Sequence, residues 1–273
     1  MASDGPSLLG GILLGAIQGL TEFLPVSSSG HLVLAQAFIH VGQDNVLFDL
    51  VLHLGTLFPA FFFFRKDIAM VLKDLVTGDL PYWQRPGVRL SLLVIAATIP
   101  TGIIGLGFKK QFDAMFDDQL VNGICFAITA IMLQLTRRMQ TGTQTLMEVP
   151  VSTAVWVGLA QGISIAPAIS RSGATIATAM FLGVEKETAF RLSFLMSFPA
   201  ILGAFLLEAR KVHEVPSDLA PYIAGALTSL VLGYASLVAL QWLVRKGRFA
   251  DFGWYVWLMA AASIGVWWFG APA

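Results

Sequence analysis

Long apolar segments, separated by short polar linkers, occupy most of the chain. A helix needs about 20 apolar residues to cross a membrane, and the segments that approach or exceed this length predict transmembrane helices. The expected spans cover residues 47–64, 90–108, 119–136, 190–207, 219–243 and 253–270. Residues 65–89 mix Arg, Lys and Asp with two prolines and are expected to form a polar, solvated loop. The pattern is typical of an all-α polytopic membrane protein.

Two further apolar segments are interrupted near their middle. In the first, residues 8–24 lead to Pro25 and a run of serines, and the apolar stretch 32–41 that follows is too short to span. The second, residues 151–183, has its break at Pro167. Each segment predicts a re-entrant helical hairpin, which dips into the membrane and returns. Broken backbone at membrane depth is tolerated only where it is buried in protein or lines a cavity, so the two breaks predict a polar site.

The two interrupted segments are part of an internal repeat. A shift of 143 residues superimposes seven small or polar positions: Gly15 on Gly158, Gln18 on Gln161, Gly19 on Gly162, Thr21 on Ser164, Ser27 on Ser170, Ser29 on Ser172 and Gly30 on Gly173. At two other positions the aligned residues differ in chemical type: Glu22 aligns with Ile165, and Ser28 aligns with Arg171. Seven matches at one shift are harder to attribute to chance than single matches between glycine-rich helices.

The repeat predicts the architecture. Each half holds one re-entrant helical hairpin and three transmembrane helices, and an odd number of spans inverts the second half relative to the first. This is the inverted-topology plan of many membrane transport proteins. The chain is therefore expected to be a single integral membrane domain, residues 1–273, with repeat one at about 8–138 and repeat two at about 151–270.

Composition supports the membrane class. Of the 273 residues, 56% are hydrophobic and 12% are charged, against about 25% charged in soluble domains. The net charge is zero, so nothing favours a nucleic-acid partner. The single cysteine, Cys125, lies in an apolar stretch and is interpreted as a packing residue. No basic segment precedes the first apolar stretch, so no cleavable signal is expected.

The distribution of basic residues predicts the orientation. In the expected topology, 12 of the 17 Lys and Arg residues lie on the side opposite the N-terminus, and four lie on the N-terminal side. The positive-inside rule places the richer side in the cytoplasm. The first hairpin then enters from outside and the second from the cytoplasm. Their broken tips meet, which brings Arg171 towards Glu22.

Glu22 and Arg171 are the one acidic and the one basic residue that lie well inside apolar segments. A charge in hydrocarbon is costly and needs a partner, water or a metal. Hydroxyls and glycine N–H groups flank Arg171, and a guanidinium in such surroundings suits phosphate. Two plainer interpretations stay open: a capped helix end with Glu22 near the interface, and an ion pair that only joins the two halves.

Further candidate chemistry surrounds Glu22. Gln18 lies one helical turn before it, on the same face, and an amide with a carboxylate suits Mg²⁺ or Ca²⁺. The serines at 27–29 offer a nucleophile, and His31 offers a base or a phosphate partner. Asp49 and His53 also share a helix face, at the start of a span; they could contact the site, but placement at the membrane interface is favoured.

Two motifs carry a family resemblance. QGLTEFLPVSSSGH at Gln18–His31 and PAISRSGAT at Pro167–Thr175 resemble the signature motifs of the undecaprenyl-diphosphatase family, the bacitracin-resistance type. The resemblance covers essentially the whole chain. It implies hydrolysis of undecaprenyl diphosphate to undecaprenyl phosphate and phosphate, which recycles the lipid carrier for peptidoglycan and other wall polymers and confers bacitracin resistance. It also implies a divalent cation, Mg or Ca, and a bacterial inner-membrane enzyme whose active site faces the periplasm or the outside.

The resemblance assigns roles by position. The implied catalytic residues are Glu22, Ser28, His31 and Arg171. The implied phosphate-binding residues are Ser27, Ser29, Gly30, Ser170, Ser172, Gly173 and Thr175, and the implied metal ligands are Gln18 and Glu22. The nucleophile stays open between Ser28, His31 and water.

Two residues depart from the family pattern. Gln18 stands where the family often has Glu, which removes one charge from the metal site. Ala168 stands where the family usually has Gly, so the backbone there lacks the conformational freedom of glycine.

Other functions remain open at the level of sequence. A transporter or lipid flippase would also use inverted repeats and broken helices, and a non-enzymatic lipid-binding scaffold is a weaker alternative. An enzyme needs a nucleophile and phosphate release, and the serine–histidine turn paired with an arginine favours the enzyme. The expected partners are the polyprenyl substrate and membrane lipid. The oligomeric state stays open, with a homodimer as the candidate.

Overall fold

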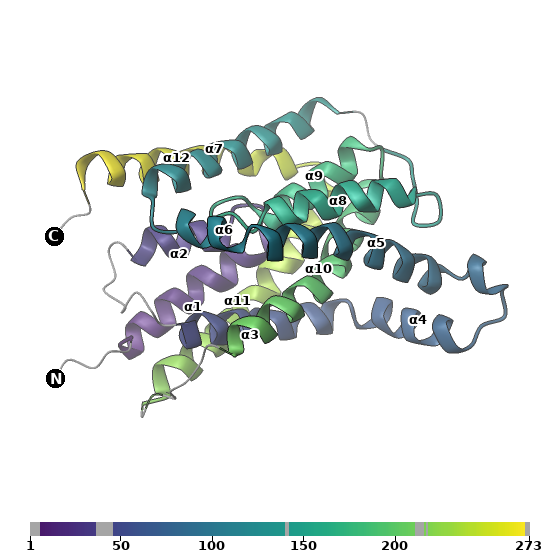
Figure 1. Cartoon of the computed structure of the whole chain (residues 1–273), viewed down its shortest axis with the longest axis horizontal. Helices are drawn as coiled ribbons and strands as arrows, with labels where there is room; N and C mark the ends of the chain where they lie inside the picture. The colour runs from purple at the N-terminus through teal and green to yellow at the C-terminus, as the bar shows by residue number, and fades with distance from the viewer. Residues whose placement is uncertain (1–5, 37–45, 140–141, 211–215, 217, 271–273) are drawn as a thin grey trace.

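The computed structural model describes residues 6–36, 46–139, 142–210, 216 and 218–270, and these residues fold almost entirely into helices (Figure 1). The first half contains α1 (Leu8–Phe23), α2 (Ser28–Gln36), α3 (Val46–Phe63), α4 (Arg65–Val76), α5 (Pro86–Gly107), α6 (Lys109–Met115) and α7 (Gln119–Leu135). The second half contains α8 (Val151–Ile163), α9 (Arg171–Phe181), α10 (Lys186–Ala209), α11 (Ala220–Arg245) and α12 (Phe252–Phe269). Short 3₁₀ turns lie at Tyr82–Gln84, Thr136–Arg138 and Phe249–Asp251.

Helices long and apolar enough to cross a membrane are found at five of the six predicted spans, and a bent helix pair lies at the sixth. Five segments of the described chain are long and apolar enough to cross: Pro86–Gly107, Gln119–Arg138, Lys186–Ala209, Ala220–Arg245 and Phe249–Phe269. The sixth is the pair α3 and α4, which meets the same criterion together and bends by 66° between Phe63 and Arg65. The protein is thus an all-helical, multi-pass membrane protein.

The predicted loop at 65–89 is wrong in its first part. Residues Arg65–Val76 form α4, because Ile68, Leu72 and Leu75 recur at helical spacing and give one apolar face. The next span also begins earlier than expected, at Pro86, since proline is favoured in the first turn of a helix.

The two interrupted segments form the predicted helix pairs. α1 and α8 are apolar but shorter than a span, and α2 and α9 are shorter still. The breaks between them contain the non-glycine residues with positive φ in the described chain: Ser27, at 67°, and Ala168, at 58°. At each break the chain reverses through a left-handed residue, which L-amino acids adopt only when the surroundings impose it.

Each hairpin packs against a long helix through a glycine. A side chain at Gly15 of α1 would place its Cβ 2.4 Å from the carbonyl oxygen of Gly225 in α11. A side chain at Gly158 of α8 would place its Cβ 2.2 Å from the carbonyl oxygen of Ala97 in α5. Small residues at such crossings let membrane helices approach closely. Gly15 and Gly158 are equivalent under the shift of 143 residues.

An aromatic core lies beside the end of α1. Phe64, Phe190 and Phe194 are buried together, and Phe194 meets Phe23 edge-on with ring centroids 5.7 Å apart. Because Phe23 follows Glu22 directly, this core fixes the last turn of α1 against α10.

Candidate active site

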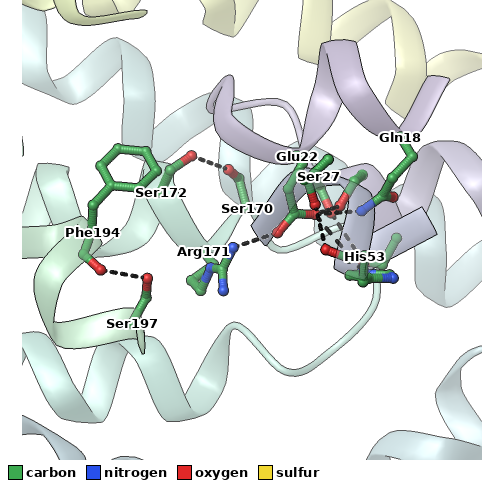
Figure 2. A network of polar contacts seen from close by, with 12 residues as sticks. Gln18, Glu22, Ser27, His53, Ser170, Arg171, Ser172, Phe194 and Ser197 are labelled. Atoms are coloured by element: carbon green, nitrogen blue, oxygen red, sulfur yellow. Dashed lines mark hydrogen bonds and ion pairs between the residues drawn. The ribbon is translucent and has the colours of Figure 1, made fainter. Parts of the chain in front are cut away.

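Glu22 is the centre of a polar cluster built from both hairpins (Figure 2). Its Oε2 accepts hydrogen bonds from Gln18 Nε2 at 2.9 Å and from Ser28 Oγ at 2.6 Å. Its Oε1 accepts from Arg171 Nη2 at 2.5 Å. The Glu22 side chain is only 8% exposed, so the charge is compensated almost entirely by these neighbours. The predicted meeting of Glu22 with Arg171 is confirmed.

Local sequence explains how α1 and α2 deliver these groups. Gln18 and Glu22 lie one turn apart and therefore share a face of α1. The helix ends at Phe23, since Pro25 cannot continue the backbone hydrogen bonds. The chain turns at Ser27, and α2 starts at Ser28. This tight turn returns the Ser28 hydroxyl to the carboxylate that precedes it by six residues.

A second turn delivers Arg171, which is the first residue of α9. Ser170 caps this helix, and its Oγ accepts from Gly173 N at 3.1 Å. Thr129 of α7 holds the turn from outside: its Oγ1 donates to Ala168 O at 2.9 Å and accepts from Ser170 N at 3.2 Å. These contacts hold Ala168 in the left-handed conformation that glycine would adopt more easily.

The predicted phosphate-binding residues divide into two groups. Ser27, Ser29 and Ser170 line the cavity beside Glu22. The others are buried away from it and do not line it: Gly30, Ser172, Gly173 and Thr175. Their polar groups serve local structure, as where Ser172 Oγ donates to Leu24 O at 3.3 Å and Thr175 Oγ1 donates to Arg171 O at 2.7 Å.

The structure does not bring His31 to the cavity. Its Nδ1 lies 2.7 Å from Ser27 O and its Nε2 lies 2.8 Å from the hydroxyl of Tyr255 in α12, on which the ring stacks. A carbonyl oxygen only accepts, so Nδ1 carries the proton and Nε2 accepts from the tyrosine. Both ring nitrogens are thus engaged, and this side chain supports the turn after α1.

His53 lies at the site, although the sequence favoured the membrane interface for it. It lines the cavity, with Nε2 3.9 Å from Glu22 Oε2 and Nδ1 2.8 Å from Asp49 O. The histidine on the apolar face of a span was a signal in the sequence. Its proximity to Glu22 depends on the packing of α3 against α1, which the sequence does not reveal.

The cluster opens into a cavity of about 510 Å³. One end holds the ion pair of Glu22 with Arg171 and the serines of both turns. The other end lies between α5, α6 and α10, where Lys109 Nζ and Glu208 Oε1 are 2.5 Å apart. The cavity is large enough for a small-molecule ligand, since such pockets measure about 300–1,000 Å³.

The residues around Glu22 fit a hard cation that keeps water and phosphate among its ligands. Gln18 Oε1 is buried with no hydrogen-bond partner among the described residues. A carboxylate has about four lone-pair positions, and three of those on Glu22 are occupied. No cluster of three or more His, Cys, Asp or Glu suited to a metal occurs in the described residues, so a full protein cage is not formed there. Mg²⁺ is commonly held by one or two carboxylates with substrate phosphates.

Comparisons with known proteins agree with the geometry. Residues 11–262 match the family described as bacitracin resistance protein BacA. An undecaprenyl-diphosphatase of Carboxydothermus hydrogenoformans is 42% identical over 258 residues, which cover 93% of this chain and 95% of that protein. One from Alkaliphilus metalliredigens is 42% identical over 264 residues (93% and 96%), and one from Methanosphaera stadtmanae is 36% identical over 268 residues (94% and 97%). The matched region includes both hairpins and the whole cluster around Glu22, and the chain belongs to the bacitracin resistance protein BacA family.

Proposed function

We propose that this protein hydrolyses undecaprenyl diphosphate to undecaprenyl phosphate and phosphate. The observation that carries the proposal is the meeting of Ser28, Glu22 and Arg171 at one end of a cavity inside a membrane protein. The relatives named undecaprenyl-diphosphatase match over nearly their full length. The reaction would recycle the lipid carrier for peptidoglycan and other wall polymers, and so confer bacitracin resistance.

Ser28 is the nucleophile that the geometry favours. Its hydroxyl already donates to Glu22 at 2.6 Å, so Glu22 accepts the proton as the oxygen attacks the terminal phosphorus. The bond from that phosphorus to the bridging oxygen breaks, and undecaprenyl phosphate leaves. A water molecule then cleaves the phosphoserine, which restores the hydroxyl and releases phosphate. Glu22 could instead activate water directly, whereas both nitrogens of His31 are occupied.

Arg171 stabilises the phosphate charge. Phosphoryl transfer depends mostly on positioning and on neutralising the equatorial oxygens. The guanidinium has five N–H donors, and in the described chain only Nη2 is engaged, with Glu22. Since Arg171 lines the cavity and is 23% exposed, the remaining donors are available to a diphosphate. An ion pair that only joined the two halves of the protein would not need a cavity beside it.

A divalent cation, Mg²⁺ or Ca²⁺, belongs to this proposal. Glu22 and the unpartnered oxygen of Gln18 would hold it, and it would neutralise charge on the diphosphate. Gln18 contributes no negative charge of its own, so substrate phosphate and water complete the ligand set.

The inverted repeat and the orientation are part of the same proposal. The equivalent glycine contacts of α1 with α11 and of α8 with α5 support two related halves, at about 8–138 and 151–270, in a single membrane domain. The excess of basic residues on one side supports a bacterial inner-membrane protein whose active site faces the periplasm or the outside. The comparisons do not favour the transporter or flippase alternative, because the matched relatives are named as diphosphatases.

Phosphate release by the purified protein in detergent tests the function. We expect release from undecaprenyl diphosphate with Mg²⁺ or Ca²⁺, loss of release with EDTA, and recovery when the metal is restored. Undecaprenyl phosphate is the control substrate and should release nothing. If a well-folded, monodisperse sample releases no phosphate from the diphosphate, the proposal fails, and lipid flipping in vesicles becomes the next assay.

A further inference from the structure

The cavity continues past the catalytic cluster as a slot between the second halves of α5 and α10. On α5 the wall includes Gly102 and Leu106, and on α10 it includes Gly203 and Leu207. These positions are four apart, so each pair presents one face of its helix to the slot. The proposed reaction uses the cluster at Glu22 and gives this part of the cavity no role.

The glycines of the slot differ from those that hold the hairpins. A Cβ at Gly15 or Gly158 would collide with backbone atoms of a neighbouring helix. A Cβ at Gly102 or Gly203 would meet no atom within 4 Å. A glycine inside a helix costs roughly 1 kcal/mol relative to alanine, and here no close helix contact accounts for it. Gly102 and Gly203 therefore leave open space inside the slot.

Both helices carry an interior proline where the slot begins. Pro100 lies inside α5 and Pro199 inside α10. Every α10 residue that lines the cavity is Pro199 or follows it. An interior proline removes a backbone hydrogen bond and bends a helix. The second halves are therefore able to diverge while the first halves remain packed in the core.

The slot is polar at its inner end and has apolar walls at Leu106 and Leu207, and the ion pair of Lys109 with Glu208 lies at its far end. Arg171 and Ser28 lie at the inner end. Leu106 and Leu207, on opposite walls, are 67% and 41% exposed, so both present apolar surface that a hydrocarbon chain matches in polarity. A chain that leaves the slot between these leucines passes directly into hydrocarbon. An amphiphile with an anionic head and an apolar tail fits this gradient.

We propose that the slot between α5 and α10 holds the first isoprene units of the prenyl chain, and that Gly102 and Gly203 are specificity residues that make room for them. The inference rests on the proposed diphosphatase function and adds the path of the lipid. The catalytic cluster holds the diphosphate, the slot holds the adjoining units, and the rest of the chain lies in the bilayer.

Photolabelling tests the path without requiring turnover. The probe is a prenyl phosphate with a diazirine on its second isoprene unit, added to the full-length protein in nanodiscs. We expect adducts in the peptides that contain residues 98–109 and 199–208, and we expect unlabelled undecaprenyl phosphate to suppress them. Adducts confined to α1, α11 or α12 would overturn the proposal.

A phospholipid with the same diazirine in its acyl chain distinguishes the occupant. Weak labelling of the two peptides by this lipid, unaffected by undecaprenyl phosphate, supports a prenyl-specific slot. Labelling of equal strength that undecaprenyl phosphate does not suppress would mean a general lipid crevice, and would contradict the proposal.

Slot-filling variants test the role of the glycines. Gly102→Leu and Gly203→Leu should raise KM for undecaprenyl diphosphate by at least about tenfold and leave hydrolysis of dimethylallyl diphosphate, which has one isoprene unit, much less affected. Gly107→Leu is the matched control, because Gly107 lies on the same helix, also meets no atom within 4 Å, and does not line the cavity.

The kinetic and labelling outcomes separate the two proposals. Unchanged KM in both slot variants, or an equal loss on both substrates, would count against the glycines as specificity residues. Slot-specific labelling without phosphate release from any substrate would reject the diphosphatase and leave a prenyl-binding slot. Phosphate release with labelling elsewhere would retain the enzyme and reject the slot.

Discussion

At the scale of single residues, the site is centred on the ion pair of Glu22 with Arg171. These are the two charges inside apolar segments, where a charge needs a partner, water or a metal, and the two facing breaks of the expected topology bring them together. His31 resembled a catalytic residue in the sequence. Its real partner, Tyr255, is 224 residues away, and only the packed structure shows that this tyrosine occupies its ring nitrogen.

The ion pair can be separated from the chemistry by paired substitutions. Arg171→Gln leaves Glu22 buried without its countercharge, which should cost roughly 3–5 kcal/mol in a buried pair and abolish turnover. The double variant Glu22→Gln with Arg171→Gln should recover much of the thermal stability in detergent and stay inactive. Thermal unfolding and phosphate release are measured on the same samples. Recovered activity in the double variant would show that the pair only joins the halves.

Ser28 and its neighbour Ser29 form a matched pair of substitutions. Ser28 donates to Glu22, whereas Ser29 Oγ lies 3.2 Å from Ser27 Oγ. We expect Ser28→Ala to lower kcat by about 10²–10⁴-fold, the typical contribution of a positioned group that transfers a proton in the reaction, and Ser29→Ala to have a much smaller effect. Single-turnover phosphate release measures both. Similar losses in the two variants would argue against Ser28 as the nucleophile.

Ala168 offers a test of backbone strain. Its φ of 58° costs a non-glycine residue about 1–2 kcal/mol, so Ala168→Gly should leave the melting temperature unchanged or slightly raised, with activity retained. Ala174→Gly, in the buried part of α9, is the control and should lower stability by about 1 kcal/mol. Equal destabilisation of the two variants in thermal unfolding would show that Ala168 is unstrained.

At the scale of elements, the apolar pattern located the helices but not all of their ends. The five candidate spans and the two broken helix pairs followed from segment length and from breaks at proline. α4 was missed because its basic and acidic residues make the segment polar overall. Its apolar face has only three side chains, and their helical spacing was given less weight than the polarity of the segment. The position of His53 beside Glu22 was left open in the sequence, because it depends on which helices pack together.

The helix crossings predict opposite effects for similar substitutions. Gly15→Ala would place a methyl group 2.4 Å from a backbone carbonyl oxygen of α11, so α1 must shift, and both thermal stability and phosphate release should fall. Gly265→Ala, in α12, meets no atom within 4 Å and should leave stability unchanged or raise it by up to about 1 kcal/mol. Unfolding in detergent compares them. A neutral Gly15→Ala would mean that this crossing does not position Glu22.

At the scale of the whole molecule, the two broken helix pairs bring different chemistries to one place. The first supplies a carboxylate and a serine, and the second supplies a guanidinium, which the shift of 143 residues aligns with Ser28. Under the proposed repeat, the two halves would share a backbone plan and differ in the charge that each brings to the site.

Orientation can be tested with single cysteines after Cys125, which is buried, is replaced by alanine. Lys110, in α6, and Lys73, in α4, are both exposed and lie on opposite sides in the proposed topology. A membrane-impermeant maleimide should label Lys110→Cys in intact cells, and Lys73→Cys only after permeabilisation. The reverse pattern would place the catalytic cavity on the cytoplasmic side.

The contact between Glu22 and Arg171 joins positions 149 residues apart in the chain, and this separation has a consequence for biosynthesis. Until the second half has been synthesised, Glu22 has Gln18, Ser28 and His53 as neighbours but lacks the guanidinium of Arg171. The negative charge of Glu22 would therefore stay without its ion-pair partner until the second hairpin inserts. Truncated chains would keep that exposed acid, a feature by which membrane quality control could recognise them, and only a finished chain would acquire a functional site.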